Sequence, residues 1–282
     1  MTEPLLKWPG GKRKLCVLLE SLFEGPCRAV YHEPFLGSGA LFLARAASGQ
    51  VQTARLSDVN PRLVSFHRAV RDRPDGVLEA LDQLPKATTN EDYLAVREAF
   101  NAAPPAAVDA RQAARLLWLN KACFNGLYRE NRAGAFNVSW GKRPVTPLPS
   151  EAHLRAVSAL LQRAEICPWD FRSAMALAGA GDQVYADPPY VPNSDTGFTK
   201  YAAEEFGAQA HRDLAALSVA AARRGAQVLV SQHDMPATTE LYEGLTVVHR
   251  MDVQRHISCK AARAKAVEVI LSPRGASSQG GE

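Results

Sequence analysis

The sequence contains few cysteines, and they follow no recognisable spacing. They are odd in number, and no Cys-x-x-Cys pair occurs among them. A disulfide framework and a cysteine-bound zinc are therefore not expected, and we predict reduced thiols in a cytosolic compartment and no metal site. The five cysteines are Cys16, Cys27, Cys123, Cys167 and Cys259.

Long apolar runs are also missing from the 282 residues. No stretch approaches the roughly 20 apolar residues that a membrane-spanning helix needs. The first residues, Met1–Lys14, are polar and basic, so a secretory signal peptide is not expected. The composition, 46% hydrophobic and 22% charged, is typical of a globular protein. We therefore expect a cytoplasmic protein with no membrane partner.

Neither sign of charge is in large excess, because 33 basic residues oppose 29 acidic ones and give a net charge of +4. Such a balance does not by itself indicate nucleic acid. The distribution is more informative: seven basic residues and one acidic residue lie between Arg111 and Thr146, and four basic residues and no acidic one lie in Lys7–Lys14. Clusters of this kind are typical of phosphate contacts, although either one alone is equally a solvated face. We predict DNA contacts by Lys7, Lys142 and Arg143.

A third glycine is absent from the turn that follows the first predicted strand. Residues Ala29–Glu33 read as a buried strand, and a turn with Gly37 and Gly39 leads into an apolar helix that runs to about Ser48. Strand, glycine-rich turn and helix form a nucleotide-binding arrangement, in which glycine lets a ligand approach the backbone. Without the third glycine a nicotinamide dehydrogenase is disfavoured. The turn suits S-adenosylmethionine, which carries no phosphate.

A carboxylate follows the second predicted strand, Ala54–Ser57. Asp58 lies 19 residues after Gly39, the separation at which such a carboxylate commonly binds ribose hydroxyls. The alternative is that Asp58 or Asn60 caps the predicted helix Pro61–Arg73. We predict that Asp58 binds the ribose of the cofactor.

Two further pairs of residues are candidates for cofactor contacts. In the turn Lys7–Lys12, Lys12 can meet a carboxylate and Trp8 offers a flat wall, although a plain turn before a helix is the alternative. After the predicted strand Ala164–Cys167, Asp170 can accept a hydrogen bond from an adenine amino group and Phe171 can pack on the ring. A cap for a helix at Phe171–Ala178 competes with that interpretation.

The segment Asp187-Pro188-Pro189-Tyr190 follows the apolar run Val184–Ala186 and so lies at the end of a predicted strand. Two prolines remove two backbone N–H donors, which leaves carbonyl groups that only accept hydrogen bonds. The Asp187 carboxylate is a further acceptor, and Tyr190 adds a flat aromatic face. These groups can hold an exocyclic amino group and stack on its ring. A proline-rich turn without a ligand is the alternative.

Helices replace the strand–helix alternation between about Asp72 and Pro149. Beyond this insertion the alternation resumes, and the end of the chain reads as an antiparallel pair of strands. His233-Asp234 has no nucleophile beside it, and we interpret it as structural. The predicted helices are Gly76–Leu84, Asn90–Ala102, Arg111–Asn120 and Ala208–Arg223, and the predicted strands after the insertion are Ala164–Cys167, Val184–Ala186, Ala226–Ser231, Leu245–Val253 and Lys265–Leu271.

The far end of the insertion, Asn120–Asn131 and Phe136–Lys142, is dense in asparagine, arginine and aromatic residues, with a strong turn signal at Asn125-Gly126. Arginine reads guanine and asparagine reads adenine in the major groove, and a side chain at a turn tip can wedge into a base step. An exposed loop without a partner is the alternative. The predicted DNA contacts here and in the basic loop Arg255–Lys260 are Asn125, Leu127, Arg129, Asn137, Arg255 and Lys260.

Together these motifs resemble the Dam-type family of DNA adenine-N6 methyltransferases, in which Asp-Pro-Pro-Tyr is the signature of amino-methyl transfer to adenine. The resemblance runs from Lys7 to about Leu271, with the motifs in the family's order. The motifs are Lys-Trp-Pro-Gly-Gly-Lys, Glu-Pro-Phe-Leu-Gly-Ser-Gly, Asp58-Val59-Asn60, the Asn125–Arg129 block, Phe136-Asn137-Val138, Asp187-Pro-Pro-Tyr190 and Ser231-Gln-His-Asp234.

The resemblance implies an α/β fold, a seven-stranded Rossmann-like methyltransferase sheet with a helical target-recognition insertion. We expect a catalytic domain of residues 1–71 and 150–274, a recognition domain of residues 72–149, and a disordered tail of residues 275–282. The resemblance further implies that Trp8, Lys12, Asp58 and Asp187 contact S-adenosylmethionine and that Arg129 reads a guanine.

The implied activity is methyl transfer from S-adenosylmethionine to N6 of a flipped adenine in duplex DNA, with S-adenosylhomocysteine as product. Asp187, Pro188 and Tyr190 are the expected catalytic residues, with no metal and no obligate protein partner. The sequence departs from the best-known members of the family at Tyr128, Lys121 and Ala122. The resemblance therefore favours a GATC-like target without fixing it. A catalytically silent DNA-binding protein and an RNA adenine methyltransferase stay open, as does a place within a restriction-modification pair or alone on the nucleoid.

Overall fold

The computed structural model describes residues 2–86, 88–106, 108–191, 206–254 and 265–275. The chain divides into two compact units. The first comprises Met1–Pro26 and Leu36–Pro168, and the second comprises Cys27–Phe35 and Trp169–Glu282. The helical segment of residues 72–149 belongs to the first unit, and its action as a separate recognition domain stays a prediction.

The strands form a seven-stranded mixed sheet in the order β3-β2-β1-β4-β5-β7-β6. Strands β1 and β4, β2 and β3, and β4 and β5 pair in parallel, whereas β7 is antiparallel to β5 and β6. The predicted α/β class and the antiparallel terminal pair are thereby confirmed. The strands are β1 (Tyr31–Glu33), β2 (Ala54–Ser57), β3 (Ala164–Cys167), β4 (Gln183–Ala186), β5 (Gln227–His233), β6 (Leu245–Gln254) and β7 (Lys265–Pro273).

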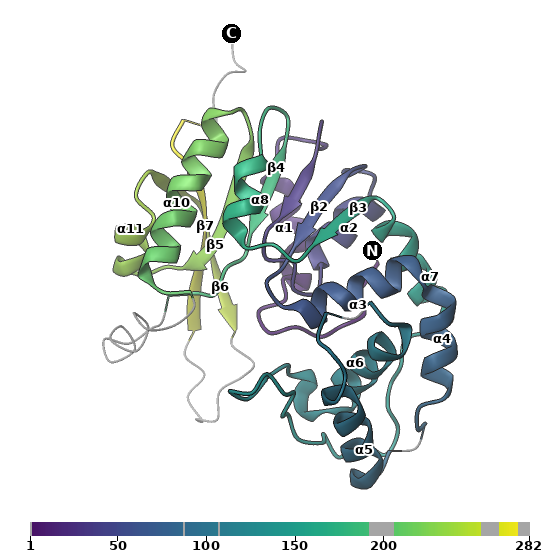
Figure 1. The fold of residues 1–282 in the computed structure, drawn as a ribbon. Helices are drawn as coiled ribbons and strands as arrows, with labels where there is room; N and C mark the ends of the chain where they lie inside the picture. The colour runs from purple at the N-terminus through teal and green to yellow at the C-terminus, as the bar shows by residue number, and fades with distance from the viewer. Residues whose placement is uncertain (1, 87, 107, 192–205, 255–264, 276–282) are drawn as a thin grey trace. The chain divides into compact units, whose positions relative to one another are not determined.

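Helix α6 of the first unit lies among α3, α4 and α5 and packs against all three (Figure 1). It begins where the Asp109 carboxylate accepts from the Arg111 N–H, and its indole donor, Trp118 Nε1, reaches the Pro85 carbonyl at 2.8 Å. Side-chain capping of this kind stabilises a helix start by about 1 kcal/mol. The helical elements are η1 (Arg13–Leu15), α1 (Cys16–Ser21), α2 (Ala40–Ala47), α3 (Pro61–Asp72), α4 (Pro74–Asp82), α5 (Asn90–Asn101), α6 (Ala110–Ala122), η2 (Phe124–Gly126) and α7 (Glu151–Leu161).

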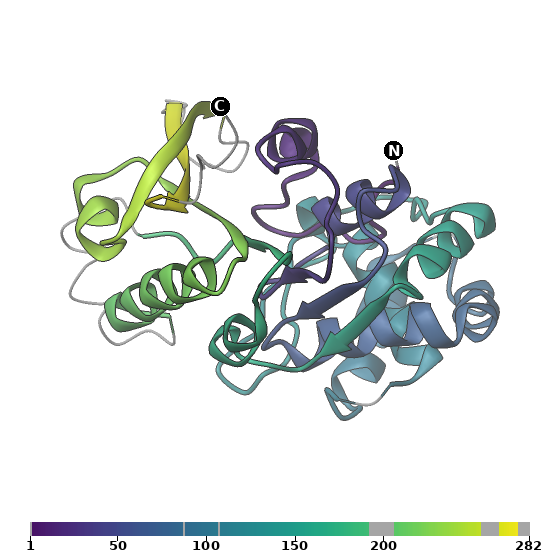
Figure 2. The same cartoon turned by 90° about the horizontal axis from the view of Figure 1, so that it is seen from above.

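In the second unit, α10 packs against α8, α11 and the strands β5 and β7 (Figure 1). Seen from above, the long helix α10 lies along one side of these strands (Figure 2). The core between them is apolar and fully buried, and Val184, Val228 and Leu214 are 0% exposed. The helices are α8 (Phe171–Leu177), α10 (Ala208–Arg223) and α11 (Pro236–Leu241). Within the part of the chain that the structure describes, no helix is both long and apolar enough to cross a membrane.

Candidate functional site

The glycine-rich turn of the first unit has a backbone that only glycine adopts easily. Gly37 and Gly39 have positive φ angles of 50° and 68°, and Gly39 is the N-cap residue that precedes α2. A Cβ atom on Gly37 would lie 3.0 Å from the Trp8 side chain. A larger residue here would therefore be strained and would displace Trp8. The glycine at this position is therefore required by the turn itself and by Trp8, and its contact with a cofactor stays a prediction.

Asp58 follows β2 and binds the backbone of this turn. Its carboxylate accepts from the Gly37 N–H at 3.1 Å and from the Asn60 N–H at 2.9 Å. The cap of α3 is Asn60, whose side chain accepts from the N–H groups of Arg62 and Leu63. Burial raises the pKa of Asp58 above its ordinary 3.8, and the hydrogen bonds from Asn60 and Gly37 oppose that rise. Asp58 is thus available for the predicted ribose contact rather than used as the helix cap.

His67 completes the support of the turn, and the sequence analysis did not identify it. Its Nε2 atom lies 2.9 Å from the Gly37 carbonyl oxygen. Burial lowers the pKa of His67 to about 4, so the ring is neutral near neutral pH. Because a carbonyl only accepts, Nε2 carries the proton and donates it to Gly37. Gly37 is therefore fixed through its N–H by Asp58 and through its carbonyl by His67.

We predict that replacing His67 with leucine weakens cofactor binding about fivefold, because one neutral hydrogen bond is worth roughly 1 kcal/mol. The turnover rate at saturating cofactor should stay unchanged. His67→Gln keeps an N–H donor and should recover most of the affinity. Calorimetric titration with S-adenosylhomocysteine measures both variants. Equal affinities for the leucine and glutamine variants would contradict a positioning role for the donor.

Trp8, which is predicted to contact the cofactor, lies beside this turn, and Lys12, the other predicted contact, follows Trp8 in the same segment. The Trp8 ring is half-buried, and its centroid lies 4.8 Å from that of Tyr128. Lys12 is buried, with its Nζ atom donating to the Gly10 carbonyl at 3.1 Å. The Tyr128 ring therefore packs against the Trp8 ring, and the edge of the Trp8 ring lies against Gly37.

Asn120 attaches the segment that contains Trp8 to the end of α6. Its side chain accepts from the Lys7 N–H at 2.8 Å and donates to the carbonyls of Lys7 and Gly126 at 2.8 and 3.2 Å. Asn120 is 1% exposed. Asn120 is not among the predicted DNA contacts of the Asn120–Asn131 block, and its amide is bound to backbone groups.

In the second unit, the Asp187–Tyr190 segment directly follows β4, as predicted. Gln232 of β5 is 0% exposed and hydrogen-bonds to the backbone on either side of Tyr190. Its amide oxygen accepts from the Val191 N–H at 3.1 Å, and its amide nitrogen donates to the Pro189 carbonyl at 3.5 Å. The predicted acceptor segment therefore has its backbone fixed by a neighbouring strand. The sequence analysis assigned Gln232 no role.

The Tyr190 side chain is held at its face and at its tip. The His233 ring meets it edge-on with centroids 4.6 Å apart, and the Tyr190 hydroxyl donates to Glu268 at 3.2 Å. Burial, followed by the nearby charge of Asp187, raises the pKa of Tyr190 well above 10.0, so the hydroxyl keeps its proton. The His233 ring thus packs against the candidate stacking residue, and its interpretation as purely structural stays a prediction. Its neighbour Asp234 pairs with Arg250 at 3.0 Å.

Asp170 and Phe171 follow the alternative that the sequence left open. The Asp170 carboxylate accepts from the Arg172 N–H at 2.9 Å and caps α8. Phe171 is 2% exposed and stacks on Phe35 with centroids 5.5 Å apart. Both residues have structural roles within the second unit, and their contacts with a cofactor stay predictions.

The predicted DNA-contacting residues of the first unit lie in a turn and a hairpin. Asn125 has a positive φ of 55° at the turn, and Leu127 is half-buried behind it. Arg129 Nε donates to the Asn137 amide oxygen at 2.7 Å across the hairpin. Lys142 and Arg143 are exposed, as is Lys7. The predicted contacts Arg255 and Lys260, the thiol Cys259 and most of the predicted tail, residues 276–282, lie outside the described residues.

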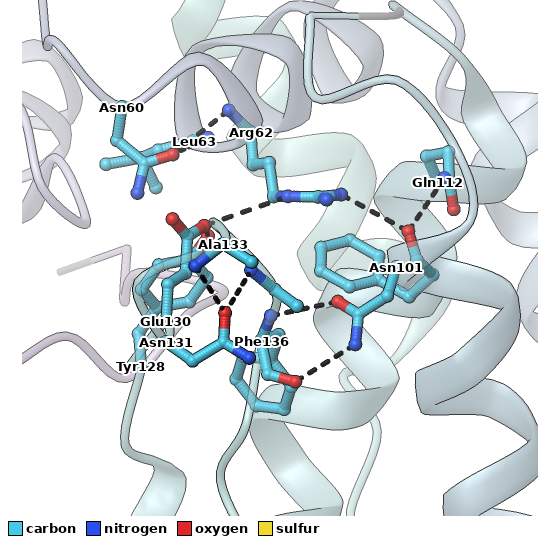
Figure 3. A network of polar contacts seen from close by, with 12 residues as sticks. Asn60, Arg62, Leu63, Asn101, Gln112, Tyr128, Glu130, Asn131, Ala133 and Phe136 are labelled. Carbon is cyan, nitrogen blue, oxygen red and sulfur yellow. Dashed lines mark hydrogen bonds and ion pairs between the residues drawn. The ribbon is translucent and has the colours of Figure 1, made fainter.

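The hairpin around Arg129, here called the 129–137 hairpin, is fastened to α5 (Figure 3). Glu130 and Phe136 form its antiparallel bridge. Asn101 of α5 donates to the Phe136 carbonyl at 3.0 Å and accepts from the Phe136 N–H at 2.9 Å. One side chain thus satisfies both backbone groups of Phe136 and fixes the second strand of the hairpin.

Comparison with known proteins gives one consistent result. The family model of D12 class N6 adenine-specific DNA methyltransferases matches residues 8–257. A DNA N-6-adenine-methyltransferase of Escherichia phage P1 is 37% identical over 274 residues, which are 94% of this chain and 35% of that protein. The type II methyltransferase M.MjaIII of Methanocaldococcus jannaschii is 31% identical over 277 residues, 93% of this chain and 95% of that protein. The DNA adenine methylase of Escherichia coli K12 is 34% identical over 273 residues, which are 95% of this chain and 93% of that protein. The chain therefore spans about a third of the phage protein and nearly all of the other two.

Proposed function

Because the chain belongs to the D12 class N6 adenine-specific DNA methyltransferases, we propose that it transfers the methyl group of S-adenosylmethionine to N6 of an adenine in duplex DNA. The observation that supports this most directly is the Asp187–Tyr190 segment, whose backbone is gripped by Gln232 and whose aromatic ring is held by His233 and Glu268. Such fixed acceptors beside a fixed ring suit an exocyclic amino group on a flat base.

The residues of the first unit fit S-adenosylmethionine. The Gly37 turn admits close backbone approach, Asp58 offers a carboxylate to the ribose, and Lys12 offers a positive charge to the amino-acid carboxylate. The Trp8 ring can meet a cationic or flat group of the cofactor. When bound, S-adenosylmethionine supplies an electrophilic methyl group on a sulfonium. We propose that Gly39, Asp170, Phe171 and Asp187 complete the cofactor-binding set.

The Asp187 carboxylate and the Pro188 carbonyl accept hydrogen bonds from N6 of a flipped adenine in the proposed reaction. Acceptance there turns the amino group out of conjugation with the ring and makes its lone pair available. Tyr190 stacks on the base, which is worth about 1–3 kcal/mol. The main contribution of the protein is placement of the reacting groups, so no covalent enzyme intermediate is required.

We propose that Arg129 reads a guanine in a GATC-like site and that Asn125, Leu127 and Asn137 act at or beside the bases. Lys7, Lys142 and Arg143 supply charge for phosphates, as would Arg255 and Lys260. The proposed location is the cytoplasm, on nucleoid DNA.

Methyl transfer from labelled S-adenosylmethionine to unmethylated plasmid DNA tests the proposal. We expect N6-methyladenine at one short motif. An RNA transcript of the same sequence and a plasmid already methylated at GATC serve as controls. Label on the RNA alone, or cofactor binding without any transfer to DNA, would overturn the proposed function in favour of an RNA methyltransferase or a silent DNA-binding protein.

As the pH is lowered, cofactor binding should begin to weaken at a higher pH than it would if Asp58 had the ordinary pKa of an aspartate. The charged form of Asp58 is the one that accepts two ribose hydroxyls, and burial raises its pKa above 3.8. Protonation, which removes acceptor capacity, therefore sets in at higher pH. The measurement is the ratio of the S-adenosylhomocysteine affinity of the wild type to that of Asp58→Asn, followed from about pH 8 down to the lowest pH at which both proteins stay folded. A ratio that does not fall as the pH is lowered would contradict the assignment of Asp58.

A further inference from the structure

Arg129 stands between two residues whose side chains are both anchored. Tyr128 packs its ring on Trp8 at 4.8 Å and on Phe136 at 5.7 Å between centroids. The Tyr128 hydroxyl also donates to the Glu130 carboxylate. The backbone of Arg129 is therefore held at the residue before it and at the residue after it, which limits the directions in which its guanidinium can point.

Glu130 is anchored in turn by Arg62, which reaches toward it from the first turn of α3 (Figure 3). The Arg62 Nε atom lies 3.7 Å from the Glu130 carboxylate. The Arg62 side chain is 5% exposed, whereas that of Glu130 is 31% exposed. A nearly buried guanidinium requires an opposite charge to be stable, and Glu130 is the carboxylate that the structure places beside it.

Arg62 itself has a well-defined position. Its Nη1 atom donates to the Phe100 carbonyl at 3.2 Å, and its guanidinium carbon lies 4.4 Å from the centre of the Phe100 ring. Its backbone N–H is bound by the Asn60 side chain at 3.0 Å. Arg62 therefore has a fixed position, and its ion pair with Glu130 fixes the position of Glu130 on the half-exposed hairpin.

The guanidinium of Arg129 is oriented on its other side by Asn137. Arg129 Nε donates to the Asn137 amide oxygen at 2.7 Å, and Nη2 donates to the Asn137 carbonyl at 3.3 Å. Asn137 is adjacent to Phe136, the residue that Asn101 fastens to α5. Both strands of the 129–137 hairpin are thus fixed from α3 and α5, with Arg129 projecting from the exposed surface.

We propose that Arg62 and Glu130 are a positioning pair for Arg129 and determine how sharply the enzyme discriminates at the base pair that Arg129 reads. The inference rests on the proposed function, in which Arg129 contacts a guanine. A bidentate arginine–guanine contact depends on the direction of the guanidinium, so loss of the ion pair lowers discrimination at one position of the site. Binding to phosphates and the chemistry of transfer do not depend on the pair.

The test compares kcat/KM for methylation of the preferred site with that for each single-base variant of it. Glu130→Gln keeps the shape of the side chain and an acceptor for Tyr128 but removes the charge. We expect the preference for the correct base to fall about fivefold at one position only. This size is typical of residues that act on a ligand without touching it. Arg129→Ala should relax the same position further. Glu98→Gln, an exposed carboxylate on α5 that carries the same charge change, is the matched control and should alter no position.

Arg62→Met removes the charge from the other side of the pair and should relax the same position. The double variant Arg62→Met with Glu130→Gln should discriminate no worse than the poorer single variant, because the two residues act as one unit. Uniform slowing at every site, or relaxation at a position other than the one that Arg129 controls, would overturn the inference. Absence of methylation by the wild type would instead refute the proposed function.

Discussion

Replacing Asp187 with alanine should lower methyl transfer about a hundred- to a thousandfold, the loss seen when one preorganised hydrogen-bonding group is removed from an active site. Asp187 is the acceptor in the proposed catalytic segment that carries a full negative charge. Its removal leaves the Pro188 carbonyl as the only proposed acceptor for the amino group. The base then has no charged partner that aligns its lone pair for transfer.

Binding of DNA should be nearly unchanged in this variant, because the residues proposed to read the target sequence and to contact phosphates lie elsewhere in the chain. Single-turnover transfer of a labelled methyl group and a gel-shift titration separate the two quantities. Asp187→Asn keeps one acceptor oxygen without the charge and should fall between the wild type and Asp187→Ala. Turnover close to that of the wild type in the alanine variant would refute the role of Asp187.

The second large effect is expected from replacing Asn120 with alanine, which should lower the free energy of unfolding by about 3 kcal/mol. Three hydrogen bonds of 2.8, 2.8 and 3.2 Å would be lost from a side chain that is 1% exposed. The backbone N–H and carbonyl of Lys7 and the carbonyl of Gly126 would lose their partner. Each abandoned group costs about 1 kcal/mol or more where water does not replace the partner.

The same substitution should weaken cofactor binding, because Trp8 follows Lys7 directly and lies against the Gly37 turn. Urea unfolding and calorimetric titration with S-adenosylhomocysteine measure the two effects. Asn90→Ala removes an exposed asparagine at the start of α5 and serves as the control, because its side chain makes no hydrogen bond among the residues that the structure describes. A variant as stable as the wild type would show that Asn120 is not the attachment point of the Lys7–Trp8 segment.

Elements with strong local signals could be predicted from the sequence. Strands β2 and β3 and helix α10 have the predicted bounds, and the three helices of the insertion agree within two residues at each end. These segments combine an apolar pattern of one period with a clear start, such as the capping box of Thr89 and Asp92 at α5. Local physics alone sets their limits.

Helix α7 was missed although its signal is present. Ser150 caps it, and its buried residues Leu154, Val157, Ser158 and Leu161 follow a helical spacing. The predicted elements include no helix between residues 150 and 163. A closer reading of this periodicity would have identified the helix.

The residues that support the site could not be found in the same way. His67 lies 30 residues from Gly37, Gln232 lies 41 residues from Val191, and Glu268 lies 78 residues from Tyr190. Each contact depends on which strands and helices become neighbours, which a single sequence does not reveal. By contrast, Asp58 and Asp187 follow strands directly, so local pattern and chemistry identified them as candidates.

The Gly37 turn has a consequence for the kinetics of cofactor recognition. Its N–H and carbonyl are both bound to protein side chains, Asp58 and His67. Its conformational entropy is therefore lost during folding rather than on ligand binding, where fixing one residue costs about 1–2 kcal/mol. A ligand that meets a preformed turn needs no slow rearrangement of it, so association at the turn is expected to follow a single exponential whose rate rises linearly with cofactor concentration.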